Sequence, residues 1–166
     1  MRTIEKKTVK AGNYVGTEHV DSLIRNYKKD RWMQNSEKIG KEDTLGIWYS
    51  ADELEEFIQT AKLHGADGIR IAFGVYGGNA PRKENEGRQT VALIATCSLN
   101  EENEAPAFKD LYVEKDGKAG LMAYNMGFPL PNVLPGTNPP PTTVTMGGDQ
   151  LGTLMVADKN KGLMII

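Results

Sequence analysis

The side chains best suited to catalysis or metal binding are few: the chain has two histidines and one cysteine. His19 and His64 lie on different predicted helices, and neither has the i, i+4 histidine partner that marks a helical metal site. Cys97 could act as a nucleophile beside a histidine. It ends a predicted strand, however, where a cysteine is more often a small buried apolar side chain. We therefore expect no metal site, no cofactor and a structural Cys97.

A second possibility is a ligand pocket around a glycine-rich loop. Residues 74–78 follow a predicted strand, but they match neither phosphate-loop pattern, and no helix follows them to bind an anion. Arg70 has small neighbours on its face of the strand, which leaves room for a ligand or for a local carboxylate partner. The candidate ligand-binding residues are Arg70, Tyr76, Arg82, Lys83 and Arg88. The alternative for the loop is an ordinary hairpin tip.

Two amphipathic helices precede this strand. The first is predicted at 17–33, with Thr17 as its N-cap, from apolar residues at helical spacing, namely Val20, Leu23, Ile24 and Tyr27. Residues 34–43 are polar and predict a loop. The second helix begins at Ser50, whose spacing from Glu53 predicts a capping box. It ends at His64-Gly65, where glycine suits a left-handed conformation.

Strict alternation over 68–76 and strong β character over 90–97 predict two strands of an antiparallel hairpin with a long exposed loop. Residues 108–113 are a candidate third strand. We expect Ile71 and Phe73 to face the helices, and a buried Phe73 would cost about 3–5 kcal/mol of stability on replacement by alanine.

Length and composition limit the function classes. A chain of 166 residues predicts one core domain. A net charge of −2 gives no electrostatic attraction to nucleic acid or an anionic membrane. No apolar run approaches the roughly 20 residues of a membrane span, and the charged N-terminus is not a secretory signal. We therefore expect no nucleic-acid partner, no membrane partner and a cytoplasmic location.

The C-terminal part differs in composition. Six of the eight prolines fall between 129 and 141, which predicts an extended connector. Apolar segments at 151–157 and 162–166 predict a terminal hairpin, and an isolated hairpin is at best marginally stable. We expect a core domain at 1–128, followed by a 129–166 extension whose hairpin packs on the core or on a neighbouring subunit.

The segment Gly68 to Gly74 reads Gly-Ile-Arg-Ile-Ala-Phe-Gly. Together with the two preceding helices and the proline-rich C-terminus, it resembles a group of small, functionally uncharacterised bacterial proteins. The resemblance implies an α+β fold and supplies no catalytic residues.

The sequence thus predicts an α+β fold: two amphipathic helices packed on a mostly antiparallel sheet, with a proline-rich C-terminal extension. The favoured function is a non-enzymatic interaction, adaptor or assembly protein that binds a protein partner or self-associates as a homo-oligomer through its C-terminal segment. The alternative is a small-ligand enzyme or sensor with a pocket around Arg70, Tyr76 and the 74–78 loop. A pocket of converging polar groups would favour the alternative, and an exposed apolar patch would favour the first function.

Overall fold

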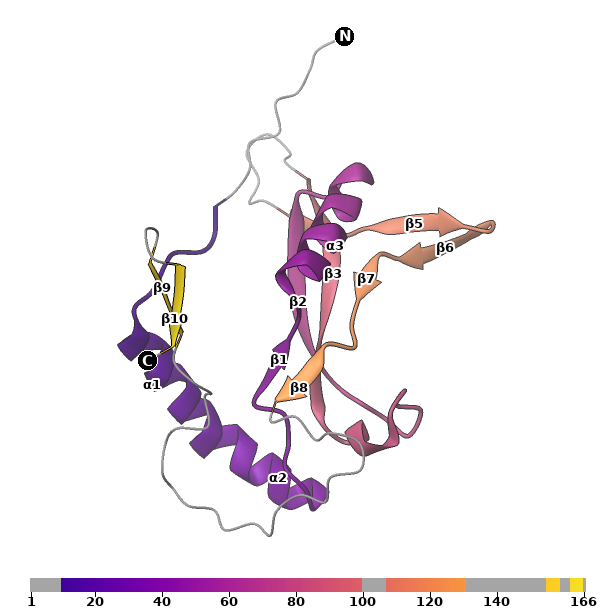
Figure 1. Cartoon of the computed structure of the whole chain (residues 1–166). Helices are drawn as coiled ribbons and strands as arrows, with labels where there is room; N and C mark the ends of the chain where they lie inside the picture. The colour runs from indigo at the N-terminus through magenta and orange to yellow at the C-terminus, as the bar shows by residue number, and fades with distance from the viewer. Residues whose placement is uncertain (1–9, 100–106, 131–154, 159–161, 166) are drawn as a thin grey trace. The chain divides into compact units, whose positions relative to one another are not determined.

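The computed structural model in Figure 1 describes residues 10–99, 107–130, 155–158 and 162–165. Internal contacts divide the chain into two units, residues 1–132 and 133–166. The second unit contains an antiparallel hairpin of β9 (Met155–Asp158) and β10 (Gly162–Ile165). The predicted connector and the start of the predicted terminal hairpin lie largely outside the described residues.

The first predicted helix is longer than its apolar pattern indicates. It comprises α1 (Thr17–Tyr27), a π-helical segment (Lys28–Trp32) and α2 (Met33–Ile39). The loop predicted at 34–43 is present only from residue 40, because residues 34–39 are helical. A polar stretch lacks the apolar spacing by which a sequence reveals a helix. Thr17 was also wrongly predicted as the N-cap: Gly16 holds that position, without a side-chain hydrogen bond.

The second predicted helix, α3 (Ala51–Leu63), is confirmed at both ends. The Ser50 hydroxyl accepts from the Glu53 amide at 3.1 Å, and the Glu53 carboxylate accepts from the Ser50 amide at 3.2 Å. After His64, Gly65 has the positive φ of 91° expected of a glycine that ends a helix. Both signals lie within a few residues of sequence, which is why they could be recognised there.

The main sheet is antiparallel and has the order β2–β3–β4. β2 (Gly68–Val75) pairs with β3 (Gln89–Leu99), as predicted, and a short 3₁₀ turn (Lys83–Asn85) lies in the loop between them. The opposite side of β3 pairs with β7 (Ala123–Tyr124) and with β4 (Ala107–Asp110). The strand expected at 108–113 is thus divided between β4 and the start of β5.

Two smaller pairs of strands complete the first unit. β5 (Tyr112–Lys115) and β6 (Lys118–Leu121) form a hairpin that projects from the main sheet (Figure 1). Its two-residue turn, Asp116-Gly117, has positive φ at both positions, as hairpins of this kind require. β1 (Gly46–Trp48) pairs with β8 (Phe128–Leu130), where Pro129 lies in a two-stranded sheet and so interrupts no central ladder.

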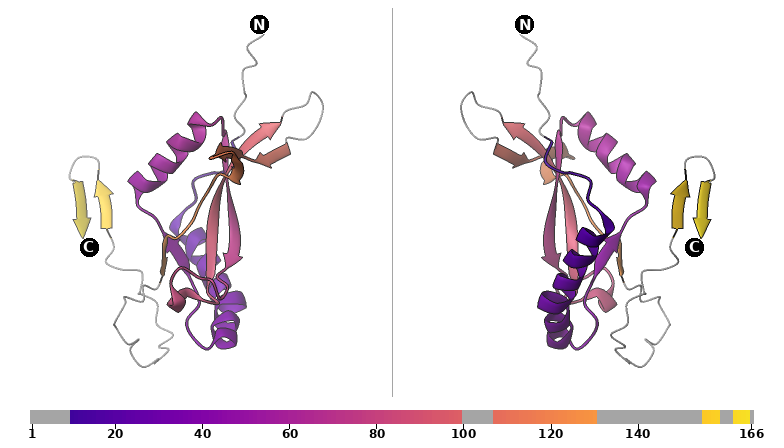
Figure 2. Two further views of the ribbon diagram at one scale, coloured as in Figure 1. Left: turned by 90° about the vertical axis from the view of Figure 1, so that its right-hand side faces the viewer. Right: turned by 90° about the vertical axis from the view of Figure 1, so that its left-hand side faces the viewer.

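The core lies between α3 and one end of the main sheet. Phe57 and Ala61 of α3 cluster with Leu93 and Ala95 of β3, and Ile69 packs against them. Figure 2 shows α3 on one side of the β2–β3 pair. Among the described residues, no helix is long and apolar enough to cross a membrane.

The predicted burial of Ile71 and Phe73 was wrong. Their side chains do share a face with Leu93 and Val91, as the pairing register requires. They are nevertheless 60% and 80% exposed, because α3 covers only the Ile69 end of that face. The first predicted helix does not contribute to this core: α1, the π segment and α2 contain no fully buried residue, and none of their residues belongs to the core cluster.

Candidate functional site

Asp43 joins the end of the first helix to the start of β3. It is 2% exposed, and its carboxylate accepts from the Asn35 amide group at 3.0 Å and from the Gln89 backbone at 2.6 Å. Its own amide donates to the Ser36 hydroxyl, and its carbonyl accepts from the Trp32 indole at 2.8 Å. A carboxylate with this many internal donors is committed to holding the fold together. No motif in the sequence marks it.

Arg88, a predicted ligand-binding residue, lies in the same cluster. It is 2% exposed, and its Nη2 is 3.5 Å from the carbonyl oxygen of Asp43. Burial lowers the pKa of the Arg88 guanidinium, and the negative charges of Asp43 and Glu42 oppose that effect. A side chain so deeply enclosed serves the packing beneath the β2–β3 loop rather than an open ligand site.

The β2–β3 loop does form a pocket, and two of the predicted residues line it. Tyr76 and Arg82 lie around it with Asn85 and Met126; the full lining is Tyr76, Pro81, Arg82, Asn85, Met126 and Gly127. The Tyr76 hydroxyl donates to Asn125 at 2.7 Å, which fixes one wall. The Arg82 guanidinium lies 5.7 Å from the centre of the Phe128 ring, within cation–π range.

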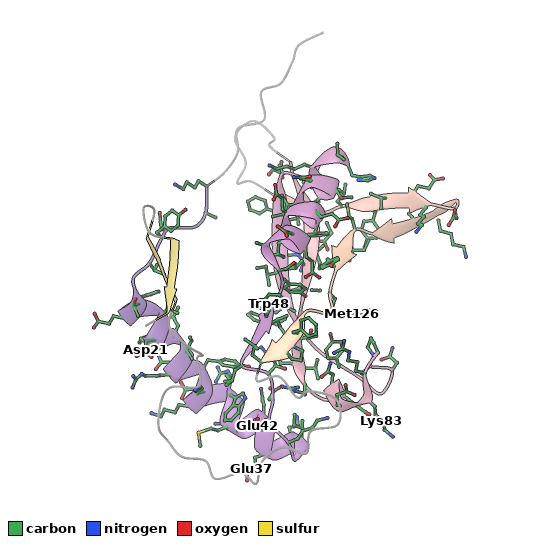
Figure 3. The ribbon with its side chains drawn as sticks, in the orientation of Figure 1. Asp21, Glu37, Glu42, Trp48, Lys83 and Met126 are labelled. Atoms are coloured by element: carbon green, nitrogen blue, oxygen red, sulfur yellow. The ribbon has the colours of Figure 1, made fainter. Side chains whose placement is uncertain are left out.

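This pocket is small for a metabolite. Its volume is about 60 Å³, whereas pockets for small molecules and cofactors span roughly 300–1,000 Å³. Lys83 is exposed on the same loop but does not line the pocket (Figure 3). Sequence reasoning missed Asn85, Met126 and Gly127. The last two lie at this loop because Asn125, beside them, bonds to Tyr76 and to the Val91 carbonyl, contacts that no local pattern reveals.

Arg70 is paired within its own sheet. It forms two hydrogen bonds with the Asp110 carboxylate, from Nε at 3.1 Å and from Nη2 at 2.6 Å. Asp110 lies on β4, two strands away across β3, and both side chains are on the face opposite α3. The local carboxylate considered from the sequence is therefore present, and Arg70 is not brought to the pocket that Tyr76 and Arg82 line.

A cluster of tyrosines connects the core with the pocket. The Tyr124 hydroxyl donates to Glu53, and this bond raises the pKa of Tyr124 to about 12. Tyr124 stacks on Phe57 with ring centres 5.4 Å apart. Burial raises the pKa of Tyr49, an effect that the Gly127 backbone opposes. A raised pKa leaves an even smaller fraction of phenolate at neutral pH, so these shifts favour structural roles.

The histidines and the cysteine do not come together as a site. His19 is exposed on α1, and His64 is exposed at the end of α3 with its Nδ1 2.9 Å from the Thr60 carbonyl. The Cys97 thiol donates to the Gly65 carbonyl at 3.3 Å. Within the described ranges, no three histidine, cysteine, aspartate or glutamate side chains gather closely enough to hold a metal ion.

Among the described residues, the outer strand of the main sheet carries a run of exposed apolar side chains. Ile71, Phe73 and Val75 follow one another on the same face of β2 and are 60%, 80% and 67% exposed. We call these three side chains the β2 strip. β2 pairs with β3 alone in the part of the chain that the structure describes, so its second edge is open there. Contiguous exposed apolar side chains of this kind mark interaction surfaces.

No protein-family model, no curated protein and no solved structure matches this chain.

Proposed function

We propose that this protein is a non-enzymatic interaction or assembly protein that binds a protein through the β2 strip. The observation that carries the proposal is the exposure of Phe73, a large aromatic ring that is 80% accessible in mid-strand. Aromatic side chains dominate protein interfaces because they bury a large area at low cost in side-chain entropy. Flanked by Ile71 and Val75, the ring forms an apolar anchor on a strand edge.

The polar features of the first unit support the same function. Arg70 and Asp43 are held by internal hydrogen bonds, Arg88 is buried, and the pocket at the β2–β3 loop has room for little more than water. The β2 strip, by contrast, is an exposed apolar surface. Such a surface suits a protein partner better than a small polar substrate.

Site-specific photo-crosslinking tests the proposal. A benzophenone amino acid replaces Phe73 in the full chain expressed in its native cells. The matched control places it at Leu63, which is 86% exposed at the end of α3. We expect adducts with a defined protein, including this protein itself, from position 73 only, and loss of those adducts when Ile71 and Val75 are changed to aspartate. Equal, undefined adducts from both positions would contradict an interaction role for the strip.

The predicted involvement of the C-terminal segment is a separate part of this proposal. Residues 129–166 were expected to provide the contact with a partner or with a second copy, and most of them lie outside the described residues. The segment therefore stays a predicted second contact, tested by truncation below.

A small-ligand enzyme or sensor is the second candidate, and the pocket lined by Tyr76 and Arg82 is the observation that favours it. Inorganic phosphate is a suitable probe, since a guanidinium binds it well. Saturable phosphate binding that Arg82→Ala abolishes and Lys83→Ala leaves unchanged would favour this candidate. Equal phosphate affinity in the two variants would exclude a phosphate site at Arg82 and with it this second candidate.

A further inference from the structure

We infer that the partner of the β2 strip is a second copy of this chain, which adds its own β2 to the open edge as an antiparallel strand. This inference rests on the proposed function and identifies the partner. Its basis is the arrangement of backbone groups, side chains and charge along β2.

The backbone groups that face the open edge belong to the residues of the strip and to Ile69. The backbone N–H of Tyr76 donates to the Arg88 carbonyl, and the backbone C=O of Tyr76 accepts from the Gly87 N–H. Both backbone groups of Tyr76 therefore point towards β3. In an antiparallel pair, this direction alternates from residue to residue. The odd-numbered residues 69–75 therefore present their N–H and C=O groups outwards. Such an edge is a template for another strand.

A strand of this sequence complements itself about a two-fold axis at Ala72. Residues whose numbers sum to 144 then lie opposite one another, so outward-facing residues meet outward-facing residues. Ile71 pairs with Phe73 of the second copy, and Ile69 pairs with Val75. Pairs of aromatic and β-branched side chains are among the favourable cross-strand combinations. The same patch serves both copies, as a closed two-fold interface requires.

Charge does not oppose this register. Arg70 is the only charged residue of β2, and in the pairing it lies opposite Gly74 of the second copy. Its guanidinium is already directed to Asp110 across β3. A Cβ added at Gly74 would meet only an ordinary contact, 3.6 Å from Thr90, so its own subunit does not demand a glycine there. Glycine within a strand often marks the close approach of another chain, and here it leaves space beside the stem of the opposing Arg70.

Other registers are less complete. An axis at Ile71 places Asp67 opposite Val75 at the end of the ladder, and an axis at Phe73 places Ile69 opposite Gly77, beyond the strand. The axis at Ala72 uses every outward-facing residue from 69 to 75. A seven-residue edge is nevertheless a small interface, so we expect a reversible dimer whose population rises with protein concentration.

Disulfide trapping tests the register. In a Cys97→Ser chain, Ala72→Cys places two cysteines directly opposite one another in a non-hydrogen-bonded pair, where Cα atoms are about 4.5 Å apart and a disulfide can form. The matched control, Gly74→Cys, offsets the two cysteines by four residues, or about 13 Å along the strand. We expect covalent dimers from position 72 and at least tenfold slower formation from position 74. Equal rates at the two positions would overturn the register.

Sedimentation equilibrium of the full chain tests the edge itself. Ile71→Pro removes an outward N–H without removing a bond to β3, whereas Ile71→Thr keeps the N–H and loses apolar surface. We expect the proline variant to remain monomeric at concentrations where the threonine variant still dimerises. A wild-type chain that is monomeric up to about 1 mM would overturn the inference, since that concentration corresponds to a binding free energy of only about −4 kcal/mol. A dimer unaffected by proline would overturn it too.

The two proposals can fail separately. If the chain is monomeric but position 73 still crosslinks to one other protein, the proposed dimer is wrong and the proposed interaction function stands. A monomeric chain without specific crosslinks at position 73 overturns both. The cysteine pair at position 72 remains informative if the proline variant does not fold, because Ala72→Cys changes a single small side chain.

Discussion

Replacing Phe73 by alanine should hardly change the stability of the monomer. A buried phenylalanine loses about 3–5 kcal/mol on this replacement. Phe73 is 80% exposed, so only about one fifth of its surface is buried in the monomer. In proportion, the loss of unfolding free energy should be about 1 kcal/mol or less. Phe57 is the matched control. It is 8% exposed within the core cluster, and Phe57→Ala should cost about 3–5 kcal/mol.

Urea unfolding at low micromolar protein concentration, where the monomer should dominate, measures both losses. The same series at high concentration should reveal the dimer. The wild-type midpoint should rise with concentration, because association stabilises the folded state by mass action, and the Phe73→Ala midpoint should rise less. A loss of 3 kcal/mol or more for Phe73→Ala at low concentration would show that the ring is buried in the monomer and would refute the β2 strip as a surface.

Four further predictions concern single features of the chain. Gly127→Ala should lower the unfolding midpoint strongly, because an added Cβ would lie 2.5 Å from a neighbouring side chain; an unchanged midpoint would show that the turn is loosely packed. Met126→Gly should stabilise by roughly 1 kcal/mol, since a non-glycine residue there holds a φ of 75°, and a loss of stability would mean that its side chain packs elsewhere. Because Glu53 raises the pKa of Tyr124 to about 12, the folded state holds that proton more tightly, so the associated stability is present below about pH 10 and is lost as the pH rises towards 12. Tyr124→Phe should flatten that alkaline decline in the thermal midpoint, and an identical slope would contradict the role of the bond. Deleting 142–166 should lower the mass measured by light scattering or cause aggregation, and an unchanged mass and solubility would remove the predicted C-terminal contact.

The candidate site was only partly accessible from the sequence. Tyr76 and Arg82, two of the five candidate ligand-binding residues, line a small pocket of about 60 Å³. Arg88 is buried beside Asp43, and Arg70 is bound to Asp110, a residue forty positions away. Local patterns identify cationic side chains in a loop or strand, but they do not reveal which carboxylates the fold will bring to them.

The sequence by itself determined the features that depend on a few neighbouring residues. The capping box from Ser50 to Glu53 fixes the start of α3, Gly65 fixes its end, and alternation from Gly68 onwards fixes the strand and its two faces. These are short-range effects of hydrogen bonding and backbone sterics, so they appear wherever the local sequence appears.

Only the tertiary structure decided which of those faces is covered. Alternation places Ile69 and Phe73 on one side of β2, yet α3 covers Ile69 and leaves Phe73 in solvent. The polar stretch around Asn35 is helical, and Asn35 donates to the Asp43 carboxylate, a contact between separate segments that the polar pattern does not reveal. Burial and hydrogen bonding of this kind depend on where segments that are distant in the sequence come to lie. An apolar pattern indicates only that a surface favours burial, and it does not indicate whether the same chain or a second copy will bury it.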